Sequence, residues 1–188
     1  MTHEQGLAKD VGSQKIGSVG LIAAAVLLVI GNLLMPYTTD PTGDIREMLR
    51  PLGEQAFRSQ ASSLLIALGF WVMLIGMAGI SRSITAGGAD WARIGFNSLV
   101  AGTALQILTL GMDIATASSV ANWLAAPEAG KEAAWSAVAA LNALGRGVVP
   151  VTWIIYWLAF ALLGLAMAQS AVYPRWLGWA GVILSAPV

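Results

Sequence analysis

Long apolar runs, separated by short polar segments, set the pattern of this chain. A helix needs about 20 mostly apolar residues to cross the hydrocarbon core of a bilayer, and four runs provide about that length. A fifth, from Trp176 to Val188, is too short for a full crossing, and we expect the natural chain to continue beyond it. The expected spans are residues 17–35, 62–80, 94–120 and 148–168, with the partial fifth at 176–188.

Two loops contain helical patterns of their own. In the first, Asp44 and Glu47 have the spacing of a capping box, and apolar residues then recur at helical spacing as far as a break expected near Pro51. In the second, the alanine-rich segment 132–144 is expected to form a helix that ends near Gly145. We expect both to be amphipathic helices at the outer membrane surface.

The sequence therefore predicts an all-α polytopic membrane helix bundle. It has four full spans, a partial fifth and two interfacial amphipathic helices in the outer loops. Residues 16–188 form a single membrane domain, preceded by a polar N-terminal tail over residues 1–15.

The third span carries an acid, Asp113, within a stripe of polar residues. A carboxylate near the centre of a bilayer costs about 2.5–3.5 kcal/mol on insertion scales, so the stripe is expected to face other helices or a wet cavity. Asp113 is then a proton relay, an ion ligand or a substrate contact, or else a protonated group that hydrogen-bonds a neighbouring helix. The second interpretation is favoured about two to one. The stripe consists of Thr103, Gln106, Thr109, Asp113 and Thr116.

Small residues on three spans predict close helix packing, because they let two backbones approach each other. Trp71 lies near the middle of the second span and is expected to pack between helices, although stacking on a ligand stays open. The packing residues are Gly20, Ala24, Gly69, Gly76, Gly164 and Ala168.

Aromatic residues near the expected span ends predict contacts with the membrane surface. Trp135 and Val138 are expected to rest on that surface, and Trp153, Tyr156 and Trp157 to anchor the start of the fourth span.

Composition narrows the function classes. Hydrophobic residues make up 57% of the chain and charged residues only 11%, against about 25% charged in a soluble domain. Ten basic and ten acidic residues cancel, which leaves no basic field for nucleic acid. There is no cysteine, and the one histidine is His3, so no metal site is expected.

No nucleophile–base pair is evident, so we expect no enzyme activity. No cofactor is identifiable, and lipid, quinone or pigment between helices stays open.

The residues SAVYPRWLGW at 170–179 resemble a late signature of uncharacterised bacterial polytopic membrane proteins, a domain-of-unknown-function class. The resemblance implies a helical membrane fold with a further span and no known activity. Locally, the same residues predict an interface anchor in which a helix break is followed by a headgroup contact and two aromatic rings. The anchor residues are Pro174, Arg175, Trp176 and Trp179.

Two functions fit the sequence. The first is an accessory, assembly or structural subunit of a larger membrane complex, with other membrane-protein subunits and the bilayer as partners. The alternative is a small transporter or channel that uses the polar stripe of the third span. We expect the protein to lie in the inner membrane. Basic residues are equally frequent on the two sides, but those on the short span flanks favour an N-terminus in the cytoplasm.

Overall fold

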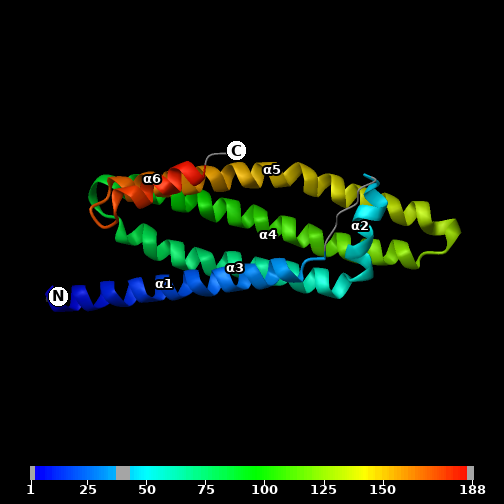
Figure 1. Ribbon diagram of the computed structural model, residues 1–188, viewed down its shortest axis with the longest axis horizontal. Helices are drawn as coiled ribbons and strands as arrows, with labels where there is room; N and C mark the ends of the chain where they lie inside the picture. The colour runs from blue at the N-terminus through cyan, green and yellow to red at the C-terminus, as the bar shows by residue number, and fades with distance from the viewer. Residues whose placement is uncertain (1–2, 37–42, 186–188) are drawn as a thin grey trace. The chain divides into compact units, whose positions relative to one another are not determined.

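The fold is entirely helical in the part of the chain that the computed structural model describes, residues 3–36 and 43–185. Short 3₁₀ turns connect some of the helices (Figure 1). In chain order the elements are α1 (His3–Leu34), α2 (Ile45–Glu54), α3 (Ala56–Ser83), η1 (Ala86–Gly88), α4 (Ala89–Ala125), η2 (Glu128–Gly130), α5 (Lys131–Gln169) and α6 (Arg175–Leu184).

Four helices, α1, α3, α4 and α5, are long and apolar enough to cross a membrane. Three of the four expected full spans fall within these helices and the first, 17–35, ends one residue beyond α1, which indicates a multi-pass membrane protein. Helix α6 has 10 residues and a length of about 15 Å, about half of the ~30 Å hydrocarbon core. The fifth span is therefore not confirmed, and its last residues, 186–188, lie outside the described part of the chain.

Helix α5 corrects the prediction of a surface helix that ends near Gly145. It runs without a break through Gly145 and Pro150 and has 39 residues, about 58 Å at 1.5 Å per residue. An interior glycine costs a helix only about 1 kcal/mol, and a proline removes one backbone hydrogen bond. The long apolar sequence that follows outweighs both, so Pro150 lies inside the helix rather than in its first turn.

The other helix ends also differ from the prediction. Helix α2 continues through Pro51 to Glu54, so the expected break is wrong. It begins as expected at Asp44, whose Oδ1 accepts a hydrogen bond of 2.8 Å from the Arg46 N–H. Helix α1 begins at His3, so residues 3–15 of the expected polar tail are helical, and residues 1–2 lie outside the described part of the chain.

The chain divides into two compact units. Unit 1 comprises residues 1–26, 69–104 and 151–188, and unit 2 comprises residues 27–68 and 105–150. Each of the four long helices contributes to both units.

Tyr156 is at the centre of the core of unit 1 and is only 3% exposed. It packs with Leu99 and Leu163, and its ring centroid is 5.5 Å from that of Phe70. Its hydroxyl is 3.1 Å from Oγ1 of Thr103, a hydrogen bond between α5 and α4. Its expected role as a membrane anchor is therefore wrong, because the side chain points into the protein.

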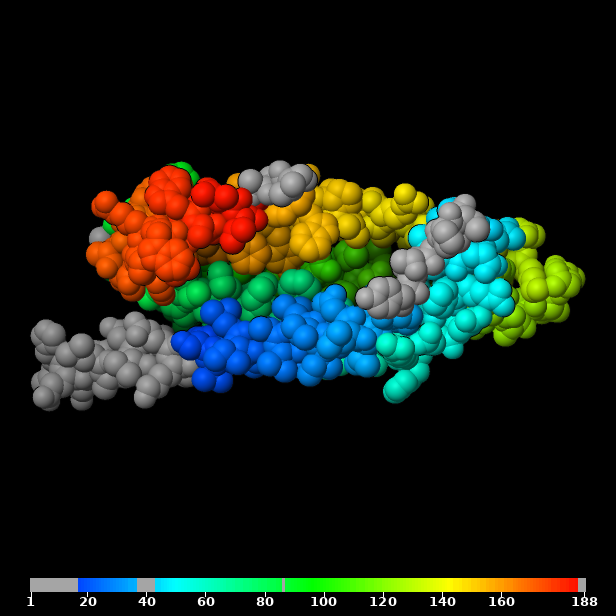
Figure 2. Space-filling view, in the orientation of Figure 1, coloured from blue at the N-terminus to red at the C-terminus, as the bar shows by residue number. Residues whose placement is uncertain are grey.

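Small residues bring the helices of unit 1 together. A Cβ atom added to Gly20 of α1 would lie 3.4 Å from the backbone nitrogen of Gly76 in α3. A Cβ atom added to Gly164 of α5 would lie 2.7 Å from the carbonyl oxygen of Gly178 in α6, and α6 covers part of α5 on the face seen in Figure 2 (orange and red). Three further packing residues, Ala24, Gly69 and Ala168, are buried.

Trp71, by contrast, does not pack inside unit 1. Its side chain is 59% exposed, so the expectation of a tryptophan packed between helices of this chain is wrong. An exposed ring on an apolar helix suits contact with lipid or with another protein.

In unit 2, α2 packs on α4 and α5. Leu49 of α2, Val120 and Trp123 of α4 and Val138 of α5 form its buried core, and Trp135 packs against this core. Val138 is fully buried. The prediction that Trp135 and Val138 rest on the membrane surface is therefore wrong, because this face of α5 is covered by α2 and α4.

A tight glycine contact between α6 and α5 generates a stability prediction. A Cβ atom on Gly178 would lie 2.6 Å from the carbonyl oxygen of Gly164 and closer still to the backbone of Ala168. Backbone atoms cannot move aside cheaply, and overpacking of this kind costs about 1–3 kcal/mol. We expect Gly178→Ala to lower the thermal unfolding midpoint in detergent. The matched control is Gly147→Ala, whose Cβ meets nothing within 4 Å; an equal loss in both variants would contradict the packing of α6 on α5.

Candidate functional site

The polar stripe lies on the side of α4 that faces the protein. Within unit 2, Thr109 and Thr116 are 4% and 6% exposed, and Gln106 and Asp113 are half-buried. Leu108, on the other side of the same helix, is 52% exposed. The fifth stripe residue, Thr103, belongs to unit 1, where it bonds Tyr156.

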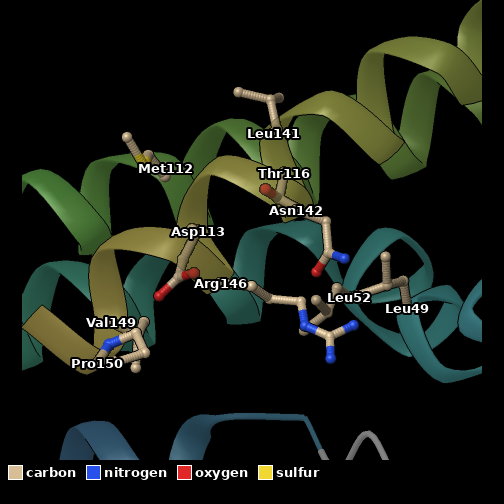
Figure 3. Close-up of a pocket in the computed structure, with 11 residues that line it drawn as sticks. Leu49, Leu52, Met112, Asp113, Thr116, Leu141, Asn142, Arg146, Val149 and Pro150 are labelled. Carbon is tan, nitrogen blue, oxygen red and sulfur yellow. The ribbon is translucent and has the colours of Figure 1, made fainter.

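Asp113 lines a pocket of about 290 Å³ in unit 2 (Figure 3). Three helices build it: α2 supplies two leucines, α4 the stripe residues and α5 both polar and apolar side chains. The lining therefore combines a carboxylate, a hydroxyl, an amide and a guanidinium with an apolar wall. The lining residues are Leu49, Leu52, Met112, Asp113, Thr116, Leu141, Asn142, Gly145, Arg146, Val149 and Pro150.

The acid and the base of this pocket do not pair with each other. Asp113 is half-buried, whereas Arg146 is exposed. In Figure 3 the carboxylate lies toward Val149 and Pro150, and the guanidinium extends toward Leu52 of α2. Within the described part of the chain, neither group makes a salt bridge or a side-chain hydrogen bond. The pocket thus holds two opposite charges that are free to contact a ligand.

Arg146 and Asn142 were missed as site residues by sequence reasoning, which placed Asn142 in a surface helix and Arg146 in the loop beyond its end. On a continuous α5 they are four residues apart, and Val149 follows three residues later, so all three share one face. This spacing could have shown from the sequence that the three residues share a face. The expectation that the helix ends near Gly145 prevented that conclusion. Pro150 adds a backbone feature: it has no N–H, so the Arg146 carbonyl has no donor from the residue four positions later.

A second hollow of about 390 Å³ continues from the pocket along α2 and α5. It shares Leu49, Asn142 and Arg146 with the Asp113 pocket and extends to Trp135. Because the two hollows have these residues in common, Arg146 is accessible from both. The groove between α2 and α5 therefore lies directly beside the Asp113 pocket.

Arg46 fastens α2 to the first turns of α5 beside this groove. Its guanidinium makes two hydrogen bonds of 2.9 Å to the carboxylate of Glu132 and lies 4.9 Å from the ring centroid of Trp135. Glu132 precedes the apolar part of α5. Its hydrogen bond with Arg46 lowers the pKa of Glu132 and raises that of Arg46. The pair is exposed, so its effect on global stability is small, and its role is to position α2.

The remaining expected site residues lie elsewhere. Pro174 precedes the first residue of α6, Arg175, and Trp176 and Trp179 are 70% and 52% exposed. Their exposure suits contact with lipid headgroups, and the anchor interpretation stays a prediction. A search of the described residues for three or more clustered histidine, cysteine, aspartate or glutamate side chains finds no candidate metal site.

Comparison with known proteins gives no relative for this chain. No family model matches the sequence, and neither the curated proteins nor the solved structures provide a match. The function must therefore be argued from the pocket itself.

The Arg46–Glu132 contact generates a prediction for α2. We expect Glu132→Gln to increase amide hydrogen exchange across Ile45–Glu54, because one charged attachment of α2 is lost. The matched control is Glu128→Gln, which removes a neighbouring acid that pairs only locally with Lys131. Unchanged exchange in Glu132→Gln, or equal increases in both variants, would contradict this role.

The same contact predicts a pH dependence. The pKa of Glu132 is lower in the folded chain than in the unfolded one. Its contribution is therefore present above the unfolded pKa, about 4.3, and is lost as the pH falls through the folded pKa. We expect exchange of α2 to rise in that acidic range in the wild type and to change less in Glu132→Gln.

Proposed function

We propose that this protein binds a small polar solute in the Asp113 pocket and serves as a small transporter or channel for it. The observation that carries the proposal is the half-buried carboxylate of Asp113, which lines the same pocket as Thr116, Asn142 and Arg146 without pairing with any of them. A charge at this place in an apolar helix is costly, and ionisable groups retained in such helices mark solute or ion paths in membrane proteins.

The proposal includes the setting of the protein. It lies in the inner membrane of a bacterium with its N-terminus in the cytoplasm, as the resemblance at residues 170–179 and the basic span flanks suggest. Helix α2 and the first half of α5 lie at the outer surface of the membrane. No step of the proposed function is catalytic.

A role as an accessory, assembly or structural subunit of a larger membrane complex is the second candidate. The small residues expected to pack helices closely are in contact within this chain, as Gly20 with Gly76 and Gly164 with Gly178 illustrate. What favours the role instead is open space at two exposed glycines: a Cβ on Gly111 or Gly147 meets nothing within 4 Å. Another helix could approach α4 and α5 there.

The transport proposal predicts the behaviour of Asp113→Asn. In liposomes that swell as small amino acids, amines or organic acids enter, we expect the wild type to accelerate swelling with at least one class of solute. Asp113→Asn should lose most of this acceleration, roughly tenfold or more, because a charge-assisted contact is worth about 1.5–3 kcal/mol.

The control for this assay is Asp90→Asn, which removes an exposed acid paired with Arg93 in the first turn of α4. Both variants should elute from gel filtration like the wild type. Wild-type swelling rates in Asp113→Asn would remove this residue from the path.

The subunit role predicts a stable larger assembly. Extraction of the tagged chain in mild detergent should yield a complex that keeps the same membrane-protein partner through gel filtration. Gly111→Leu and Gly147→Leu should weaken that complex, because the larger side chains occupy the space open to a neighbouring helix. Recovery of monomer alone would reject the role.

A further inference from the structure

The Asp113 pocket has a chemical character that narrows its ligand. Its two charged groups have opposite signs, come from different helices, and do not reach each other. The half-buried carboxylate of Asp113 loses part of its hydration and normally gains from a cationic partner, whereas Arg146 on the same pocket is exposed. Here the pocket separates them, and a ligand between them could satisfy both.

We propose that the pocket binds a small zwitterion, with an ammonium group held by Asp113 and a carboxylate or phosphate held by Arg146. A guanidinium binds either oxyanion through two parallel hydrogen bonds. An ammonium has three N–H donors, and these can reach the Asp113 carboxylate and the Thr116 hydroxyl, which lie one helical turn apart on α4. This inference rests on the proposed function, because it assigns the solute of that pocket.

Size and wall chemistry agree with such a ligand. A volume of about 290 Å³ corresponds to that of roughly ten water molecules in the liquid, at ~30 Å³ each. It therefore suits a molecule with about ten non-hydrogen atoms. Leu49, Leu52, Met112 and Leu141 provide an apolar wall that the carbon linker between the two charges can contact.

The same chemistry has two sources in a membrane. One is a free solute such as an amino acid or phosphoethanolamine. The other is the headgroup of phosphatidylethanolamine, in which an ammonium and a phosphate are joined by two carbons. The groove from the pocket toward Trp135 offers an apolar path for an attached chain, so both sources have to be tested.

The test measures binding of three soluble probes to the full chain in nanodiscs of phosphatidylglycerol, a lipid without an ammonium group. O-Phosphoethanolamine carries both charges, ethanolamine only the cation, and methyl phosphate only the anion. By isothermal titration calorimetry we expect the two-charge probe to bind about tenfold or more tightly than either single-charge probe.

Two variants test which residue binds the ammonium group of the ligand and which binds its phosphate. In Asp113→Asn, the affinity for O-phosphoethanolamine should fall to that for methyl phosphate. In Arg146→Gln, it should fall to that for ethanolamine. A variant that misfolds would lose binding of all three probes together. Loss of only the contribution from one charged group therefore reports on the contact that the substituted residue makes. The control is Arg82→Gln, an exposed arginine in the last turn of α3, which should bind like the wild type.

Nanodiscs that contain phosphatidylethanolamine distinguish the sources. If the headgroup is the ligand, native mass spectrometry should find this lipid retained on the wild type and lost from Arg146→Gln, and O-phosphoethanolamine should bind more weakly in these discs. If the solute is free, its binding should be the same in both kinds of disc.

The results separate this inference from the proposed function. Equal affinities for the two-charge and single-charge probes, or equal losses for all probes in both variants, would overturn the zwitterion. Solute-dependent swelling that needs Asp113 would still support transport in that case. Failure of both the binding and the swelling assays would reject the pocket as a solute site.

Discussion

The cost of placing a carboxylate in an apolar environment is the constraint on which this structure depends. Insertion scales put it at about 2.5–3.5 kcal/mol at the bilayer centre, so α4 can lie among acyl chains only if Asp113 is turned away from them. The structure meets this constraint: Thr109 and Thr116, on the same side as Asp113, are buried, and Leu108 on the other side is exposed. The orientation of α4 in turn decides which face α2 and α5 cover, and where the pocket forms.

The length of α5 brings a base to this acid. Because α5 continues through Gly145 and Pro150, Arg146 lies on a rigid helix beside α4 instead of in a loop. Helix α2 then closes the third side of the pocket with Leu49 and Leu52, and the Arg46–Glu132 contact fixes its position. The pocket is thus made by long helices and one attached short helix, and its acid and its base come from two different helices.

The four spans could be predicted from sequence because an apolar run of sufficient length is a local property. The predictions that were wrong concern features that depend on contacts with residues distant in the sequence. Gly145 resembled a helix end, yet the apolar residues beyond it continue the helix, and this error also concealed Arg146 as a neighbour of Asp113. Tyr156 resembled an anchor because it lies among tryptophans, but it is buried beside residues distant in sequence, such as Leu99 and Thr103, the latter 53 residues away. Val138 resembled a surface residue until α2 covered it.

The most direct test of the central claim is a nitroxide scan of α4, which the absence of cysteine from the sequence makes straightforward. Single cysteines over residues 105–116 would be spin-labelled in liposomes, and their collision rates with dissolved oxygen, which concentrates in the hydrocarbon core, would be measured. High rates are expected at Leu108 and Gly111, on the exposed side, and low rates at Thr109, Asp113 and Thr116. Equal or higher oxygen collision rates at Asp113 and Thr116 than at Leu108 would contradict the inward orientation of the acid, and with it the pocket and its proposed ligand.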